Sequence, residues 1–185
     1  MSSTIVKDSP AIYVASLSDY NAGTLHGRWI HIDEDTTADD VYIGIREMLA
    51  ESNEVGAEEW EIHDTDYWPK GIAHQAAGWD LEDLVKAAHL ILEHGQAIAC
   101  YYEHTGEFNE EGFTDHYLGW WESAESFARD ELLEIMDFKI PDQLLAHVNW
   151  DTLTRDLMRD RFAAYEGTRH HLFEGEEGVH IFYQG

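Results

Sequence analysis

Carboxylates are the most abundant reactive side chains in this 185-residue sequence, with 38 Asp and Glu against 11 Lys and Arg. Paired carboxylates can act as general acid and base, but 38 of them always supply some pairs, so their presence does not indicate an enzyme. The sequence has no GxSxG, Walker or GxGxxG motif. The single cysteine, Cys100, lies in an apolar stretch, which favours a core position over a reactive one. We therefore expect no catalytic residues and no cofactor.

Twelve histidines raise the question of a metal site. Ligands on one helix face need a spacing of three or four residues, whereas His89 and His94 are five apart. There is no HExxH motif, and neither 33–35 nor 64–66 continues into an EF-hand loop with its glycine at the sixth position. We expect no metal site, only weak binding of counterions.

The net charge of −27 is concentrated in the middle of the chain. Residues 29–128 hold 24 acidic and three basic side chains, a net of −21, whereas residues 129–185 have a net of −6. The acids alternate with aromatic residues, which is typical of a folded, acid-coated surface. This charge argues against a nucleic-acid binder of the usual basic kind and against an anionic membrane as partner.

The remaining composition fits a protein of a reducing cytoplasm. One cysteine cannot form an intramolecular disulfide, the start of the chain lacks a signal-peptide pattern, and no apolar run approaches the roughly 20 residues that cross a bilayer.

Two explanations of the acidity stay open. The charge of −27 equals that of about 46 Å of DNA duplex, roughly 13 or 14 base pairs, so the chain could mimic DNA. Alternatively, an acidic protein adapted to high salt could have an unrelated enzymatic or scaffold role.

The elements that position these charges predict an α+β fold. Alternating apolar residues predict strands, and apolar stripes that follow capping residues predict helices. The expected strands are 11–17, 28–33, 59–64 and 116–122, and the expected loops are 19–23 and 107–115. Helices are expected at 37–52, 81–95 and 96–105, and a further helix should begin at Ser123 and bury Phe127, Leu132, Leu133 and Met136.

Two more features are expected near the C-terminal end. A segment begins at Pro141 and has Leu144, Leu145, Val148, Leu153 and Leu157 as its apolar positions, and a terminal hairpin pairs 169–173 with 179–183.

The segment from Ile12 to Trp29 resembles the opening of the ArdA antirestriction proteins, a Tyr-x-Ala-x-Leu strand followed by Tyr-Asn-x-Gly-x-Leu-x-Gly-x-Trp. The matching positions are Tyr13, Ala15, Leu17, Tyr20, Asn21, Gly23, Leu25, Gly27 and Trp29. Residues 61–64 look like the family's Ile-His-Asp strand end, and residues 149–157 are similar to its C-terminal segment, with Asn149 and Trp150 in place of Asp and Tyr. We expect the motif residues to determine the fold, since Asn and Gly tolerate the left-handed backbone of tight loops.

The resemblance implies a DNA mimic that is not an enzyme and binds no nucleic acid. Such proteins are elongated, acidic homodimers that occupy the DNA-recognition core of type I restriction–modification enzymes and protect mobile genetic elements. Three small subdomains are expected: an N-terminal α+β unit at 1–68, a central helical unit at 69–106, and a C-terminal α+β unit at 107–185 that forms the dimer contact. The expected DNA-like surface consists of Asp33, Glu34, Asp35, Asp39, Asp40, Glu47, Glu51, Glu54, Glu58, Glu59, Asp64, Asp66, Glu82, Asp83, Glu93, Glu103, Glu107, Glu110, Glu111 and Asp115.

Overall fold

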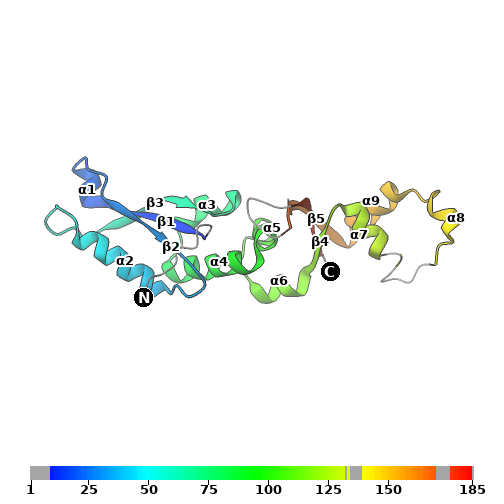
Figure 1. Ribbon diagram of the computed structural model, residues 1–185, viewed down its shortest axis with the longest axis horizontal. Coiled ribbons are helices and arrows are strands. Elements are labelled where there is room, and N and C mark those ends of the chain that lie inside the picture. The colour runs from blue at the N-terminus through cyan, green and yellow to red at the C-terminus, as the bar shows by residue number, and fades with distance from the viewer. Residues whose placement is uncertain (1–8, 132, 134–138, 170–175, 185) are drawn as a thin grey trace. The chain divides into compact units, whose positions relative to one another are not determined.

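The chain has an α+β fold, as the sequence predicts. A computed structural model describes residues 9–131, 133, 139–169 and 176–184 (Figure 1). Within these residues it contains nine helices and two antiparallel sheets of three strands each. None of the described helices is both long enough and apolar enough to cross a lipid bilayer.

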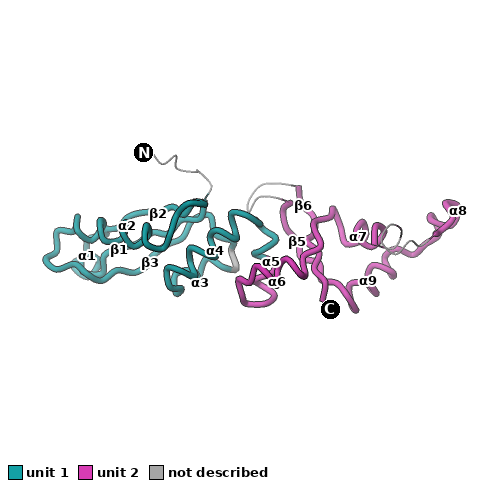
Figure 2. The backbone as a smooth tube through the Cα atoms, turned by 90° about the horizontal axis from the view of Figure 1, so that it is seen from below, with its two compact units in different colours: residues 1–99 teal, residues 100–185 magenta. Residues whose placement is uncertain are grey.

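The chain divides into two compact units, residues 1–99 and 100–185, drawn in teal and magenta in Figure 2. The division falls within the helix α5 (Gln96–Thr105), which the sequence predicts with the same bounds. The three subdomains expected from the sequence stay a prediction.

The first unit is built on a sheet in which β1 lies between β2 and β3. The strands are β1 (Ala11–Ser16), β2 (Gly27–His31) and β3 (Trp60–Asp66). Both neighbours are antiparallel to β1, and Tyr13 lies opposite Trp29 on one side and Asp64 on the other. Because successive side chains alternate between the two faces, Ile12 and Val14 share the other face, where both are fully buried. The three strands expected in this region are confirmed, each within two residues of its expected ends.

Helix α2 (Ala38–Ala50) packs against the sheet through Val41, Ile45 and Met48, which recur at helical spacing and are buried. Thr37 begins the helix in a capping box with Asp40, as its position in the sequence predicts.

A short helix, α1 (Leu17–Asn21), replaces most of the loop expected at 19–23, so that expectation is wrong. Ser16 caps this helix by accepting a 3.3 Å hydrogen bond from the backbone N–H of Asp19. The chain then turns at Gly23, whose φ of +85° suits glycine. The cap at Ser16 belongs to a residue that also ends β1, which is why the sequence pattern hides it.

Two further helices complete the first unit, α3 (Lys70–Ala76) and α4 (Leu81–His94). Helix α4 is confirmed: Asp80 caps its start, and Gly95 ends it with a φ of +58°. Its buried side, which includes Leu84 and Ile91, contributes to the core of the unit, and α4 packs against α2. Helix α3 has no counterpart among the expected elements.

The helices of the second unit are α6 (Glu110–His116), α7 (Ala124–Asp130), α8 (Asp142–Leu145) and α9 (Trp150–Asp160). Helix α6 occupies most of the segment 107–115, so the loop expected there is wrong. Asn109 caps it with a 3.1 Å bond to the N–H of Gly112, and Phe113 anchors it with 3% exposure. Leu132 and Met136, expected inside the helix that begins after Ser123, lie outside the described residues.

The second sheet has the order β4-β6-β5, with strands β4 (Tyr117–Trp121), β5 (Phe162–Thr168) and β6 (Glu177–Tyr183). The strand expected at 116–122 is confirmed. The terminal hairpin is right in its second strand, but the partner of β6 is β5, which ends before residue 169; residues 170–175 lie outside the described part. Phe127, Phe162 and Ile181 form a buried core cluster in this unit.

Candidate interaction surface

The carboxylates expected to form the DNA-like surface are almost all at the surface of the chain. Nineteen of the twenty are exposed, and Asp33 is half-buried. Fifteen lie in the first unit, from Asp33 to Glu93, and five in the second, from Glu103 to Asp115. The α2 region alone carries Asp39, Asp40, Glu47 and Glu51 on its exposed positions.

Two of these carboxylates face a cation of the chain itself. Arg28 on β2 reaches across to α2, with nitrogen–oxygen distances of 3.1 Å to Glu47 and 2.7 Å to Glu51. The hydrogen bond that Arg28 donates to Glu51 is the main reason why the pKa of Arg28 is raised. Glu47 and Glu51 are thus partly neutralised.

Four others hold the local backbone as well as carrying charge. Asp33 accepts a 2.6 Å bond from the hydroxyl of Thr36, and Asp40 completes the capping box of α2. The hydrogen bond from the Thr37 side chain is the largest cause of the lowered pKa of Asp40. On β3, Asp64 accepts from the N–H of Thr65 at 2.8 Å.

The fourth, Asp66, accepts a 3.0 Å bond from the N–H of Tyr67, a non-glycine residue with a φ of +58°. Removing one of these four acids would therefore change the backbone as well as the charge.

Among the residues that the structure describes, two carboxylates are buried, and both lie outside the expected surface. Asp19 has 2% exposure and Glu131 7%. Asp19 accepts from the hydroxyls of Ser16 and Ser52, and these bonds, that of Ser16 first, lower its pKa. The Ser-x-x-Asp spacing of a capping motif is the sequence signal for this local role.

The residues of the N-terminal motif have different surroundings. Ala15 is fully buried, and a Cβ on Gly27 would lie 2.5 Å from the carbonyl oxygen of Val14. Tyr20, Leu25 and Trp29 are exposed, by 56%, 67% and 41%. A role in folding accounts for the glycines and the alanine more directly than for these three large side chains.

Tyr13, Leu17, Asn21 and Gly23 complete the motif. Tyr13 is half-buried on β1, Leu17 is half-buried at the start of α1, and Asn21 and Gly23 are exposed at its end.

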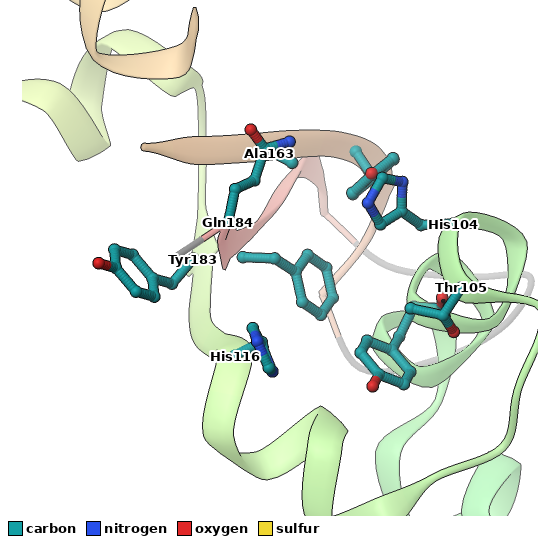
Figure 3. A pocket seen from close by; sticks show the side chains of 9 residues that line it. His104, Thr105, His116, Ala163, Tyr183 and Gln184 are labelled. Atoms are coloured by element: carbon teal, nitrogen blue, oxygen red, sulfur yellow. Dashed lines mark hydrogen bonds between the residues drawn. The ribbon is translucent and has the colours of Figure 1, made fainter. Parts of the chain in front are cut away.

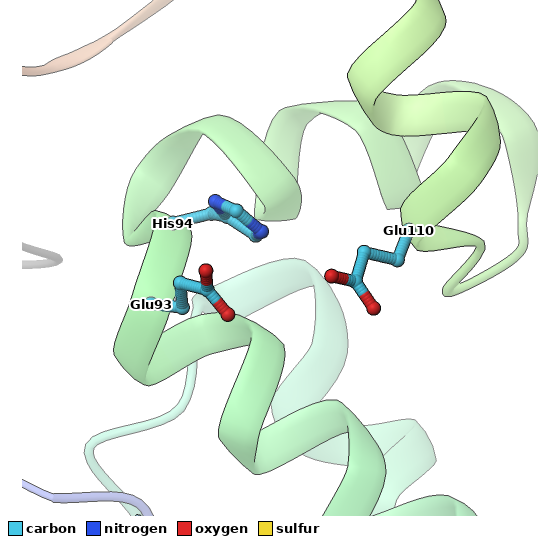
Figure 4. Close-up of side chains that lie close together, drawn as sticks. All are labelled: Glu93, His94 and Glu110. Carbon is cyan, nitrogen blue, oxygen red and sulfur yellow. The ribbon is translucent and has the colours of Figure 1, made fainter.

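Figure 4 shows Glu93 and His94 at the C-terminal end of α4. Their side chains lie close together, with a carboxylate oxygen of Glu93 and an imidazole nitrogen of His94 within 4.8 Å of one another. His89, the other histidine of α4, directs Nε2 to the carbonyl oxygen of Asp33 at 3.0 Å. The expectation that the chain holds no specific metal stays a prediction.

A pocket of about 390 Å³ opens in the second unit (Figure 3). It is lined by Tyr101, His104, Thr105, His116, Ala163, Tyr165, Phe182, Tyr183 and Gln184. His116 donates from Nδ1 to the carbonyl oxygen of Gly112 at 2.7 Å, because a carbonyl can only accept. The lining combines aromatic faces with uncharged hydrogen-bonding groups and includes no carboxylate, amine or thiol. Cys100, expected in the core, is buried.

Comparison with known proteins places the sequence in a protein family. A family model described as antirestriction protein (ArdA) matches residues 12–169. That span covers most of the chain and includes both units. No curated protein matches the sequence.

Proposed function

The chain belongs to the ArdA family of antirestriction proteins, inhibitors rather than enzymes, and from this membership we propose that it acts as a mimic of DNA. Its target is the DNA-recognition core of type I restriction–modification enzymes, from which it displaces DNA. It works in the bacterial cytoplasm, where it protects an incoming mobile genetic element from cleavage.

One observation carries this proposal: nineteen of the twenty expected surface carboxylates are exposed, and few cations accompany them. Only Glu47 and Glu51 of that set pair with an arginine of the chain among the described residues. A DNA-binding groove presents Lys and Arg to phosphates, and exposed carboxylates can take the place of those phosphates. Like DNA, they would release counterions on binding.

The amount of charge fits the same purpose. A net charge of −27 equals that of about 46 Å of duplex DNA, and a homodimer would present about twice that length. We propose that the homodimer forms through residues 107–185. Residues 129–185 carry a net charge of only −6, so two copies repel each other least there. Sedimentation equilibrium of the full chain tests this: a monomer at micromolar concentration in 0.15 M salt would refute the dimer.

The test of the function is displacement of DNA. A purified type I enzyme is bound to labelled target DNA, and the protein is added at salt concentrations from 50 to 300 mM. Stoichiometric displacement is expected, with an affinity for the enzyme that falls steeply as salt rises, because each ion pair formed releases counterions. A folded dimer that displaces no DNA from several type I enzymes would overturn the proposal.

The same preparation tests adaptation to high salt as the alternative origin of the acidity. A protein that depends on salt to screen its own repulsion unfolds as salt is removed. The DNA-mimic proposal instead expects a folded protein at 50 mM salt, which circular dichroism would measure.

A further inference from the structure

The face of the first sheet that is turned away from α2 carries two aromatic side chains, Trp29 and Tyr13, of which Trp29 is exposed and Tyr13 half-buried. Arg28 reaches Glu47 and Glu51 on α2, so the even-numbered positions of β2 face that helix. Trp29 between them must project from the opposite face, because successive side chains of a strand alternate. It is 41% exposed there.

Tyr13 lies beside Trp29 on this face. The two residues are direct partners across β1 and β2, and their ring centroids are 5.4 Å apart at an interplanar angle of 55°. A Cβ on Gly27 would lie 2.7 Å from Cζ and from the hydroxyl of Tyr13, so the Tyr13 ring lies across this glycine. The absence of a side chain at Gly27 thus fixes where the ring lies.

Carboxylates border the aromatic pair on the third strand. Asp64 is the partner of Tyr13 on β3, and Glu61 is the partner of Ala15. Direct partners of an antiparallel pair share a face, which places both acids on the Tyr13 side of the sheet. The Glu61 side chain is 64% exposed. Ala15 and Gly27 form the next row of the sheet; Ala15 is fully buried, and the Tyr13 ring covers Gly27.

Resting on the proposed function, we propose that this aromatic pair, with the carboxylates beside it, binds arginine side chains of the basic partner. The guanidinium group would stack on Trp29 and Tyr13 while its N–H groups bond to Asp64 or Glu61. A planar cation matches both parts of the surface, since it is attracted to aromatic faces and pairs with carboxylates in two parallel bonds. A lysine ammonium is a compact point charge and stacks less well.

Within the second unit, two arginines of the chain itself stack on tryptophan rings. The guanidinium carbon of Arg129 lies 4.4 Å from the ring centre of Trp150, and that of Arg169 lies 5.1 Å from that of Trp120. In the described part of the first unit no cation lies over Tyr13 or Trp29, and the 41% exposure of Trp29 leaves part of this pair accessible to a cation from another molecule.

The inference also gives a role to the exposed Trp29 of the N-terminal motif. Gly27 and Ala15 shape the platform, and Trp29 and Tyr13 form it. In this account the carboxylates supply charge, and the rings supply a preference for arginine that charge alone cannot give.

The test compares two peptide probes of equal length and charge, hexa-arginine and hexa-lysine, titrated into the full-length protein. The wild type should bind hexa-arginine about two- to five-fold more tightly at this exposed site. Trp29→Leu should lose that preference, and Trp29→Phe should keep most of it. The matched control is Tyr42→Leu: Tyr42 is 49% exposed in the same unit but lies on α2, so its replacement should change nothing.

A second readout covers the case in which Trp29→Leu does not fold. The indole N–H resonance of Trp29 is assigned by its loss in Trp29→Phe, and it should shift more with hexa-arginine than with hexa-lysine. Equal affinity for the two peptides in the wild type, or a preference that survives Trp29→Leu, would refute the inference.

Competition for a type I enzyme distinguishes failure of this inference from failure of the proposed function. If the wild type and Trp29→Leu displace DNA equally well, the DNA-mimic function stands without the arginine-binding site. If peptide preference is present but DNA is never displaced, the platform stands without the mimic.

Discussion

The hydroxyl of Ser52 donates a 2.5 Å hydrogen bond to Oδ2 of Asp19. This bond joins the segment that follows α2 to α1, and the same oxygen accepts from Ser16 at 2.6 Å. Asp19 is only 2% exposed, so this carboxylate serves the fold and not the surface. The carboxylates of this chain therefore fall into two groups: those exposed at the surface, and those buried in hydrogen-bond networks.

Asp19→Asn should make the first unit less stable at neutral pH. The hydrogen bonds from Ser16 and Ser52 lower the pKa of Asp19 below its value in the unfolded chain. The stabilisation is therefore complete above the unfolded pKa of about 4 and is lost as pH falls through the lower folded value. Urea denaturation between pH 2 and 7 should show a smaller acid-dependent loss in the variant than in the wild type. Glu54→Gln, at an exposed position, should leave this pH profile unchanged.

Tyr117→Phe should destabilise the second unit by about 0.5–1.5 kcal/mol, because it removes the hydrogen bond from the Tyr117 hydroxyl to the buried ring of His180. His180 is 1% exposed, and its Nε2 donates to the carbonyl oxygen of Thr168 at 2.9 Å. Its Nδ1 must then accept from the hydroxyl of Tyr117, 3.0 Å away. Burial raises the pKa of Tyr117 to about 12, so this donor keeps its proton at neutral pH.

Guanidinium denaturation measures this difference. Tyr183→Phe, which removes a hydroxyl from a side chain on β6 that is 40% exposed, is the matched control and should have little effect. Equal stabilities of the two variants would show that the bond to His180 contributes nothing.

Gly27→Ala should cost about 1–3 kcal/mol, as expected when a group is forced into a packed site. The new Cβ would lie 2.5 Å from the carbonyl oxygen of Val14 and 2.7 Å from the Tyr13 ring, so β1 and β2 would have to move apart. Thermal unfolding measures the loss. Gly78→Ala is the control, because its Cβ would meet only the carbonyl oxygen of Gln75 at an ordinary 3.5 Å.

Single neutralisations of surface acids should change inhibition by less than about five-fold, since an exposed ion pair contributes 0–1 kcal/mol. The triple variant with Gln at Glu54, Glu58 and Glu59 should need about ten-fold more protein for half-displacement of DNA from a type I enzyme. The control removes the same charge at three acids that lie within 4.0 Å of the chain's own arginines: Glu125, Asp151 and Asp156. It should inhibit nearly as well as the wild type. Loss of all inhibition on removal of one acid would contradict a distributed charge surface.

Elements with strong local signals could be predicted from the sequence. The apolar alternation of β1 and the Thr37 and Asp80 caps of α2 and α4 fix those elements within a few residues. Helices α1 and α6 were not predicted, because their few residues are polar or acidic and each depends on a cap and a tertiary contact. For α6 that contact is the burial of Phe113. The terminal hairpin could also be predicted, but its first strand, β5, ends at Thr168 and so precedes the expected segment 169–173.

The exposure of the acids could also be predicted, because a carboxylate is costly to bury unless it is hydrogen-bonded. What the sequence could not give is the face on which each side chain lies. The motif residues Tyr13, Gly27 and Trp29 read as fold determinants along the chain. Only the register of β1 and β2 shows that one aromatic lies across the glycine and the other beside it.

The division of the chain into two compact units also divides its charge almost equally. Residues 1–99 hold 19 acidic and five basic side chains, and residues 100–185 hold 19 and six, for net charges of −14 and −13. A partner that engages both units binds a bivalent ligand, in which the bound unit keeps the released one at a high effective concentration. Dissociation then proceeds in two steps, each opposed by rebinding. Avidity of this kind gives a long residence time from contacts that are individually weak, and rising salt weakens both contacts together.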